Sequence, residues 1–540
     1  MKKTMKQHSF ISRLKSLAVV FGIALTFTSC ANEDVAQNPT NPNEDNDENL
    51  TTFVAGDETK TRTSLNYNSS DFYWEAGDYI YVKDDNDVLQ KSSNAPTSKV
   101  ASFKYKVPGK FTNHSNYKVY YLGKNSSGNS VTISTNQSQT APDNTVHFGA
   151  AGDYGTATAN KVTGKQQFAF ELEHQPAYLV FQPYTSNTIL QNCYLTKVEV
   201  SSDNDIAEKY TVNPTTGALV ASAVTNGKQI VLATKDPTSG SAYNNGFPLT
   251  NNSASVTTNG AYMVIKPGTH TLKVRYWVKD VATHVEGTIT KTYSSTAYAS
   301  NTYYDMTANL DVKNYDGDKY YMWDAQEQYW KGHEWNLGGS QPTLTTPSAN
   351  SDNYPKNSSD TNNRWFHERA SSGRFDATQS CATLPNANEL SWYVMYGDPR
   401  WDADELWTTM GHLYKGGMWF KKKSVLQGEG HYDTEKSADG TTDMRTTAKT
   451  YYNTSSSIKN FGLPSAADAD NYFYLPALGG YGSGRLYGVG DSCDYWSSSA
   501  YPWTIGHAYY LHFYNASVYV DSTSRYHGNR AQKFSDFGDN

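Results

Sequence analysis

The sequence predicts a mainly β protein, and three observations support this prediction. The apolar residues are unusually aromatic, with 42 Tyr, 20 Phe and 12 Trp among 540 residues, and aromatic side chains pack well on pleated sheets. Short alternating or β-branched runs, separated by turn residues, recur from residue 50 to about residue 312. No helix of convincing length is predicted in that part of the chain. Strands at such short spacing predict β-sandwiches rather than a parallel α/β sheet.

The first 29 residues have the pattern of an export signal. Basic residues precede an apolar run at residues 17–27, which is too short to span a bilayer as a helix. The run ends in a small residue followed by Cys30. This ending resembles the lipobox of bacterial lipoproteins, and the resemblance implies that Cys30 is acylated after cleavage and supplies a lipid anchor. The alternative is an ordinary secretory peptide that happens to end in cysteine.

Residues 30–49 are predicted to form a disordered tether. They are rich in Asn, Pro and acidic residues, and they contain too few apolar side chains to offset the loss of chain entropy on folding. Acidic residues directly after the lipid cysteine resemble the surface-export signal of lipoproteins in Gram-negative gut and oral anaerobes. The resemblance implies a surface-exposed lipoprotein of the cell outer membrane.

Two β-sandwiches are predicted between residues 50 and 312. Candidate strands lie at residues 79–82, 117–122, 177–181, 195–200, 261–265 and 271–278. Residues 150–165 are rich in Gly, Ala, Thr and Asn and are interpreted as a long surface loop. We place the boundary near Glu173, which gives sandwiches at residues 50–173 and 174–312.

The runs TRTSL (61–65) and FYWEAGDYIYV (72–82) resemble the opening of the fimbrillin (Mfa-like) family. The resemblance implies two transthyretin-like sandwiches in a pilus precursor that is trimmed after a basic residue, here Lys60 or Arg62. A strand from the next pilin subunit would then fill the resulting groove by donor-strand exchange. An open strand edge over an apolar groove gains a ladder of backbone hydrogen bonds in this way. The alternative is that Arg62 is a strand residue and no trimming occurs.

A third domain is predicted at residues 315–540, where Trp, Tyr and His become frequent. Its central helix is expected in the run LPNANELSWYVM (384–395), with Asn386 as N-cap and Glu389 reaching back to it. Burial is expected at helical spacing for Leu390, Tyr393 and Val394. A second short helix is expected at about residues 403–411.

Four elements of this third domain resemble FISUMP domains, which belong with the C-type-lectin-like and formylglycine-generating-enzyme folds. They are TLPNANEL (383–390), YLPA (474–477), YWSSSAY (495–501) and RYHGNR (525–530). The resemblance implies an α+β C-type-lectin-like domain. Cys381 and Cys493 lie in this one domain and are the candidate disulfide; two free thiols are the alternative.

The sequence argues against most catalytic classes. Gly482-Ser-Gly484 lacks the flanking glycines of a nucleophile elbow. The same run lacks the lysine of a phosphate-binding loop. His333 has no second histidine at the spacing that a metalloprotease zinc site requires. The net charge of −7, from 46 basic and 53 acidic residues, argues against nucleic-acid binding. We therefore expect no enzyme and no cofactor. A formylglycine-generating type of oxidase, whose copper site uses a pair of cysteines, is the remote alternative.

One acidic cluster is a weak candidate for a calcium site. It contains Asp398, Asp402 and Asp404, and hard cations require several carboxylate or carbonyl oxygens. The alternative is a turn followed by a helix N-terminus, where carboxylates are favoured by the helix dipole.

A stretch dense in Tyr, Trp, Gly and Ser at residues 472–501 is predicted to combine scaffold and contact surface. We expect Trp496 to be buried, and Tyr481, Tyr487 and Trp503 to be exposed on loops. Rigid aromatic faces with adaptable small polar groups are typical of binding surfaces. The candidate ligand-binding residues, for a glycan or a protein ligand, are Tyr481, Arg485, Tyr487, Tyr501 and Trp503.

Together these observations predict an exported surface lipoprotein that acts as a fimbrial adhesin, at a pilus tip, through its C-terminal domain. A terminal position is favoured because an extra domain follows the second sandwich. The competing prediction is a structural or anchor lipoprotein whose extra domain only packs and binds no ligand.

Overall fold

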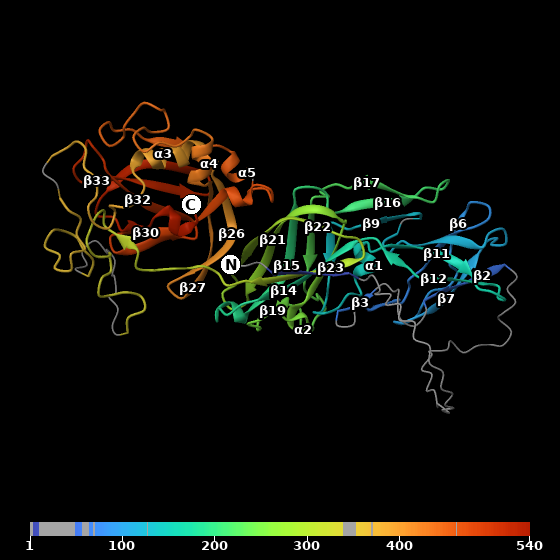
Figure 1. Ribbon diagram of the computed structural model, residues 1–540. Helices are drawn as coiled ribbons and strands as arrows, with labels where there is room; N and C mark the ends of the chain where they lie inside the picture. Colours follow the sequence, from blue (N-terminus) through green and yellow to red (C-terminus); the bar gives the residue numbers. More distant parts are fainter. Residues whose placement is uncertain are drawn as a thin grey trace, which may run out of the picture.

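The computed structural model describes residues 4–9, 49–56, 64–67, 71–126, 128–338, 353–368, 371–460 and 462–539. These residues form a mainly β molecule, which confirms the predicted fold class. Figure 1 shows an elongated arrangement with the C-terminal domain, in orange and red, at one end. Cys30, Lys60, Arg62 and the predicted tether up to residue 48 lie outside the described residues. No helix within the described ranges is long and apolar enough to cross a membrane.

The end farthest from the C-terminal domain is an eight-stranded sheet in the order β6-β5-β8-β11-β12-β2-β7, with β13 attached to β11. Its strands are β2 (Leu50–Ala55), β5 (Tyr81–Lys83), β6 (Leu89–Lys91), β7 (Phe103–Pro108), β8 (Asn116–Tyr121), β11 (Gly155–Lys161), β12 (Gln167–Phe170) and β13 (Glu173–His174). A hairpin of β3 (Ser64–Asn66) and β4 (Asp71–Tyr73) precedes β5, and Tyr67 and Phe72 make ring contacts with Tyr303 and Tyr178 in the middle of the molecule. Strand β2 lies between β12 and β7, and its Phe53 and Ala55 are fully buried.

The WEAGD part of the run at residues 72–82 forms a tight turn around a buried tryptophan. Trp74 is fully buried and makes edge contacts with the rings of Tyr105 and Tyr121 at 5.4 and 5.8 Å. The Asp78 carboxylate accepts a hydrogen bond from the backbone N–H of Glu75 at 2.7 Å. The motif therefore builds the core of this sandwich.

The middle of the molecule packs two sheets face to face. One has the order β1-β23-β14-β20; the other begins β10-β18-β15-β21-β22, with β19 paired to β15. The strands are β1 (Thr4–Ser9), β10 (Asn136–Ser138), β14 (Ala177–Tyr184), β15 (Cys193–Ser202), β18 (Gln229–Ala233), β19 (Phe247–Pro248), β20 (Ala261–Ile265), β21 (Gly268–Asp280), β22 (Glu286–Tyr298) and β23 (Thr302–Asn309). A smaller sheet contains β9 (Ser130–Thr132), β16 (Glu208–Val212) and β17 (Leu219–Ala223).

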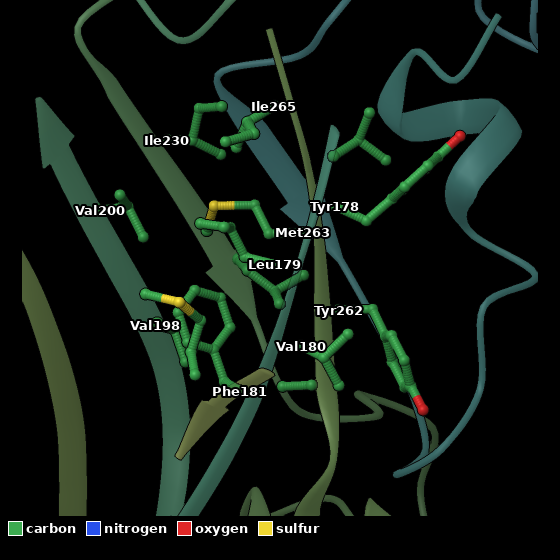
Figure 2. Packing of buried hydrophobic residues seen from close by; sticks show 14 of the residues in the cluster. Tyr178, Leu179, Val180, Phe181, Val198, Val200, Ile230, Tyr262, Met263 and Ile265 are labelled. Atoms are coloured by element: carbon green, nitrogen blue, oxygen red, sulfur yellow. The ribbon is translucent and has the colours of Figure 1, made fainter. Parts of the chain in front are cut away.

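Strand β14 is buried on both faces. Figure 2 shows Leu179 and Phe181 pointing toward Val198 on β15, while Tyr178 and Val180 point away from it. This alternation follows from the two-residue period of a strand. The continuous apolar run AYLVF (177–181), which lacks a polar face, is explained by this double burial.

The two edges of the β1-containing sheet differ. On the β20 edge, Gln137 donates to the carbonyl of Val264 and accepts from its N–H, and Gln139 accepts from the N–H of Tyr262. These side chains occupy the backbone groups that another strand would use. On the opposite edge, β1 pairs antiparallel with β23, from Thr4 opposite Thr307 to Ser9 opposite Thr302.

The C-terminal domain contains a sheet in the order β25-β35-β32-β33-β34-β28 and a second one that begins at β26. Its strands are β24 (Asn314–Tyr315), β25 (Tyr320–Tyr321), β26 (Arg400–Thr409), β27 (His412–Lys421), β28 (Tyr451–Asn453), β29 (Tyr472–Pro476), β30 (Leu478–Gly482), β31 (Arg485–Val489), β32 (Ser492–Ala500), β33 (His507–Tyr514), β34 (Ser517–Ser524) and β35 (Asn529–Arg530).

The helices in the described ranges are α1 (Phe148–Ala151), α2 (Val256–Asn259), α3 (Ala387–Tyr396), α4 (Lys423–Gly428) and α5 (Ser457–Asn460), with short 3-10 turns at Leu190–Asn192, Ala469–Asn471 and Phe534–Phe537.

Helix α3 begins as predicted. Asn386 accepts from the N–H of Glu389, and the Glu389 carboxylate accepts from the N–H of Asn386, which completes the capping box. Leu390, Tyr393 and Val394 are buried. The second predicted helix is wrong: residues 400–409 form strand β26, because they pair with β27 over most of their length.

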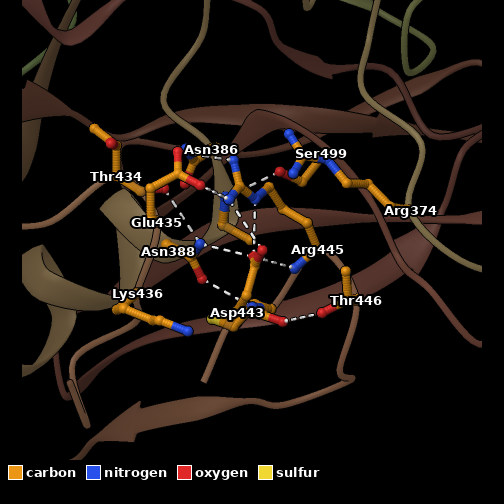
Figure 3. A network of polar contacts seen from close by, with 12 residues as sticks. Arg374, Asn386, Asn388, Thr434, Glu435, Lys436, Asp443, Arg445, Thr446 and Ser499 are labelled. Atoms are coloured by element: carbon orange, nitrogen blue, oxygen red, sulfur yellow. Dashed lines mark hydrogen bonds and ion pairs between the residues drawn. The ribbon is translucent and has the colours of Figure 1, made fainter. Parts of the chain in front are cut away.

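Polar side chains fix the N-terminal end of α3 to the loop at residues 434–446, as Figure 3 shows. Asn388 donates to Asp443 at 2.9 Å and accepts from the N–H of Met444 at 2.8 Å. Arg445 donates from Nε to the same Asp443 carboxylate at 2.8 Å. The TLPNANEL run is therefore scaffold, and its asparagines position a loop.

Asp324 organises a second loop of this domain. Its side chain is fully buried, and its carboxylate accepts from the N–H groups of Thr378 and Gln379 at 2.8 and 2.6 Å. Oδ1 accepts a longer hydrogen bond from the N–H of Cys381 at 3.4 Å. Asp324 itself has a left-handed φ of 56°. One buried carboxylate thus orders the chain that leads into α3.

Candidate functional site

The C-terminal domain is joined to the middle sandwich at strand β26. Thr288 of β22 is bridged to Glu405 of β26, so the sheet of the sandwich continues into the C-terminal domain. Arg275 of β21 donates to Asp402 at 3.1 Å and to the hydroxyl of Thr288 at 2.9 Å. Arg275 and Asp402 are both buried, so the joint rests on a desolvated ion pair.

The aspartates of the acidic cluster serve this joint and its surroundings. Asp398 pairs with Arg400 at 2.8 Å, Asp402 with Arg275 at 3.1 Å, and Asp404 with Lys415 at 3.5 Å. The described residues contain no group of three or more His, Cys, Asp or Glu placed to hold a metal ion. Each of these carboxylates is directed to a basic side chain rather than to a shared cation position.

Glu405 lies half-buried beside Asp402 in the same joint. Its carboxylate accepts hydrogen bonds from the N–H and the hydroxyl of Thr290, at 3.0 and 2.6 Å. Burial and the neighbouring charge of Asp402 raise the pKa of Glu405 from 4.5 to about 7. Glu405 therefore holds its proton in the folded protein at pH values where an exposed glutamate is ionised.

Stability is expected to fall as pH rises from about 5 to 7. In this window the unfolded chain has released the Glu405 proton and the folded chain keeps it, so the free energy of unfolding decreases with increasing pH. Between pH 5 and pH 7, urea unfolding should show a larger decrease in the free energy of unfolding for the natural protein than for Glu405→Gln. Equal pH dependence in the two proteins would contradict the raised pKa.

The candidate disulfide is absent. Cys381 and Cys493 are free buried thiols in separate apolar clusters. The sulfur of Cys381 accepts from the N–H of Asp324 at 3.3 Å, and Cys493 donates to the carbonyl of Gly479 at 3.4 Å. Burial raises the pKa of both thiols to about 12. The free-thiol alternative is confirmed, and the two sulfurs do not form the cysteine pair of a copper site.

The predicted aromatic residues divide between core and surface. Trp496 is 1% exposed, and its indole donates to the carbonyl of Tyr321 at 2.7 Å, which confirms its predicted burial. Tyr487 and Trp503 are 56% and 71% exposed, as predicted. Tyr481 differs from the prediction because its ring is half-buried and stacks on Tyr329 at 5.0 Å.

The five candidate ligand-binding residues lie in two places. Tyr481, Arg485 and Tyr487 belong to the β30–β31 hairpin, and Tyr481 is bridged to Gly528. Tyr501 and Trp503 follow β32, where Tyr501 makes an edge contact with the ring of Tyr509 at 5.2 Å. The sequence alone did not separate these two groups.

A pocket of about 200 Å³ adjoins Tyr481. The residues that line it are Gly317, Asp318, Gln328, Trp330, His333, Glu334, Trp335, Met410 and Tyr481. Trp335 is 47% exposed, and Trp330 makes an edge contact with Tyr481. The pocket therefore combines aromatic walls with carboxylate, amide and imidazole groups.

The polar groups of this pocket are partly occupied with one another. Gln328 donates from its amide to Glu334 at 3.0 Å and accepts from the N–H of Trp330 at 2.7 Å. Burial opposes ionisation of Glu334, but its backbone and side-chain hydrogen bonds outweigh burial and lower its pKa. Among the described residues, Oδ1 of Asp318 is buried and receives no hydrogen bond. That oxygen can accept from a ligand.

Sequence reasoning missed Asp318, Trp330 and Trp335 as pocket residues. The signal available was the change of composition after residue 315, in the run YDGDKYYMWDAQEQYWKGHEW (315–335). Tyr481 comes from a distant hairpin, so the pocket exists only after β30 is placed beside the turn-rich segment that follows β25.

No protein-family model matches the chain, and no curated protein matches it. Among solved structures, a candidate cell adhesion protein from Bacteroides ovatus is 15% identical, with a TM-score of 0.30, over 48% of this chain and 93% of that one. A fimbrial protein from the same species is 11% identical, with a TM-score of 0.23, over 88% and 97%. The fimbrial anchor protein Mfa2 from Porphyromonas gingivalis is 11% identical, with a TM-score of 0.21, over 45% and 82%. These values do not assign the chain to a family.

Proposed function

We propose that the chain is exported as a surface lipoprotein whose precursor is held at the outer membrane by acyl chains on Cys30, and that it acts as a fimbrial adhesin after this N-terminal part is trimmed. Its C-terminal domain binds a glycan at the pocket formed by Trp330, Trp335 and Tyr481. The observation that carries the proposal is the composition of this pocket. One exposed and two half-buried aromatic rings stand beside a buried carboxylate oxygen that receives no hydrogen bond within the described residues.

The chemistry of a sugar suits these groups. A pyranose has an apolar C–H face that packs on an aromatic ring and a rim of hydroxyls that need hydrogen-bond acceptors. Trp335 supplies an exposed ring for the C–H face of the sugar. Asp318 supplies a buried carboxylate oxygen, and a sugar hydroxyl that donates to this oxygen offsets the cost of burying it. The volume of about 200 Å³ is small for a ligand pocket and suits one sugar unit of a longer glycan.

Trp335→Ala is expected to weaken glycan binding at least about fivefold, because truncating one stacking aromatic removes roughly 1–3 kcal/mol at a binding surface. A glycan array probed with the chain from Ala31 to Asn540 identifies a binder, and titration of that glycan measures the change. Asp318→Asn is expected to weaken binding as well, because the carboxylate is the stronger acceptor.

Trp503→Ala is the matched comparison, since Trp503 is more exposed than Trp335 and lies outside the pocket. If only Trp503→Ala loses glycan binding, the ligand contacts the loop that carries Tyr501 and Trp503 rather than the pocket. Absence of binding across host and dietary glycans would contradict a glycan ligand.

The fimbrial part of the proposal is supported by the position of β2. Trimming after Lys60 or Arg62 removes residues 50–55 from between β12 and β7, and so vacates a slot lined by the neighbours of Phe53. A strand from another pilin subunit fills such a slot with both backbone ladders. N-terminal sequencing of surface-extracted protein tests this step, and acylated Cys30 on every copy would rule out trimming.

The second candidate is a structural or anchor protein whose extra domain binds no ligand. The buried Arg275–Asp402 pair favours it, because the pair fixes the extra domain to the sandwich. Immunogold labelling separates the two roles. Label at filament ends supports the tip adhesin, and label confined to the cell body supports the anchor.

A further inference from the structure

A cavity of about 490 Å³ lies where the middle sandwich meets the C-terminal domain. The lining residues are Tyr184, Lys273, Thr290, Lys291, Thr292, Tyr293, Thr307, Ala308, Asn309, Trp419, Leu463, Pro464 and Ala469. They come from β14, β21, β22 and β23 of the sandwich and from β27 and the segment before β29 in the C-terminal domain. Ligand sites form preferentially at domain interfaces, and this volume lies in the usual range for such sites. The joint therefore has both the position and the room of a ligand site.

Aromatic rings line the cavity from both sides of the joint. Tyr184 ends β14 and Tyr293 lies in β22, whereas Trp419 lies in β27 of the C-terminal domain. Trp419 is half-buried, and its indole N–H donates to the Asp402 carboxylate at 3.1 Å. This hydrogen bond orients the ring. An indole held in one orientation offers a face on which an apolar surface of a ligand packs.

Hydroxyl and amide groups lie among these rings. They belong to Thr290, Thr292, Thr307 and Asn309. A threonine hydroxyl both donates and accepts, and an asparagine amide does the same with separate atoms. Lys273 adds an ammonium group, which has three donors and gives one of them to the carbonyl of Pro464. A ligand with several hydroxyls therefore meets both donors and acceptors in this cavity.

Positive and negative charges around the cavity are close to balance. The basic side chains are Lys273, Lys291 and Arg275, and the acidic ones are Asp402, Glu405 and Asp470. Each of these acidic groups accepts a hydrogen bond from a residue of the lining. Burial and the neighbouring Arg275 lower the pKa of Lys273 to about 8, and nearby carboxylates oppose this shift. The cavity therefore selects neither an anion nor a cation.

An uncharged sugar chain has the properties that this lining requires. A pyranose combines an apolar C–H face with several hydroxyls and carries no net charge. We infer that the cavity binds an uncharged oligosaccharide, with one sugar ring packed on Trp419 and hydroxyls bonded to the threonines of β22 and to Asn309. The volume is about 490 Å³, against about 200 Å³ for the pocket at Trp335, so roughly two sugar units fit.

This second site goes beyond the proposed function, because it does not depend on the pocket at Trp335. It also differs from that pocket in its position. A ligand here touches the sandwich and the C-terminal domain together, so its binding stabilises the joint between them by mass action.

A glycan array probed with the Trp335→Ala variant of the chain from Ala31 to Asn540 tests the cavity separately from the first pocket. We expect this variant to retain uncharged di- and trisaccharides. For a retained sugar, adding Trp419→Leu should weaken binding at least about fivefold, because the stacking face is lost. Trp419→Phe is the matched variant. It loses the same hydrogen bond to Asp402 but keeps a ring, so it should retain most of the binding.

Filling the cavity gives an independent measurement. Ala469→Trp should abolish binding of the retained sugar, because a large ring then occupies the site. Ala467→Trp is the matched control, since Ala467 is exposed and is not among the described residues that line the cavity. Affinity should change less than about twofold between roughly 0.05 and 0.5 M NaCl, because salt screens only charged partners.

Each outcome bears on one site. If Trp335→Ala retains no sugar, or if Ala469→Trp binds as well as Ala467→Trp, the second site is overturned and the pocket at Trp335 stands on its own test. A preference for sialylated or sulfated glycans, with affinity that falls as salt rises, would overturn the uncharged class of ligand. Equal losses for Trp419→Leu and Trp419→Phe would overturn the stacking role. Unchanged binding of every glycan by Trp335→Ala would count against the first pocket alone.

Discussion

Replacing Arg275 by methionine is expected to lower the free energy of unfolding by about 3–5 kcal/mol. Methionine keeps much of the apolar stem but removes the guanidinium, which leaves Asp402 buried without its cation. The charge of Asp402 also lies beside Glu405, so the loss of Arg275 affects the whole joint. Urea unfolding monitored by tryptophan fluorescence measures the change.

Two further variants make this test specific. Lys415→Met removes one of the two cations beside Asp404, and because the side chains of Lys415 and Asp404 are partly exposed the expected loss is below about 1 kcal/mol. Adding Asp402→Asn to Arg275→Met should recover part of the stability, because the uncompensated charge is then gone. Equal losses for Arg275→Met and Lys415→Met would show that burial does not strengthen the pair.

Asp324→Ala is expected to cost about 3 kcal/mol, because it leaves the backbone N–H groups of Thr378 and Gln379 buried without an acceptor. The loss is also expected to loosen the chain before α3. Hydrogen exchange at residues 378–381 measures that local effect, and urea unfolding measures the total.

Asp324→Asn is the matched variant. Asparagine tolerates the left-handed φ of 56° and keeps one acceptor oxygen, so the expected loss is only about 1 kcal/mol. If both variants lose the same stability, the charge and the second oxygen of the carboxylate, which asparagine lacks, would explain the effect rather than the backbone conformation, which asparagine tolerates.

Local signals in the sequence predicted local structure well. The capping box of α3 joins Asn386 to Glu389 within one turn, so spacing alone reveals it. The strand β14 was visible as the apolar run at residues 177–181, and the burial of Trp496 followed from its place in a strand-like motif. In each case the residues that decide the outcome lie within a few positions of one another.

Signals that depend on distant partners were missed. Residues 403–411 were expected to be helical, but pairing with β27 and the bridge to Thr288 make them a strand. The acidic cluster was interpreted as a candidate calcium site because Arg275, the basic residue that pairs with Asp402, lies far away in the sequence, in another domain. Tyr481 was expected in solvent, but Tyr329 stacks on it. No spacing rule in one sequence reports such contacts.

The glutamine side chains that cover β20 make the two edges of the middle sheet unlike. Gln137 and Gln139 occupy the backbone groups of that edge through their amides, and a side-chain amide offers no continuing ladder. The two sides of the sheet are therefore closed by different means: β20 is capped by side-chain amides, whereas β23 is capped by the backbone of β1.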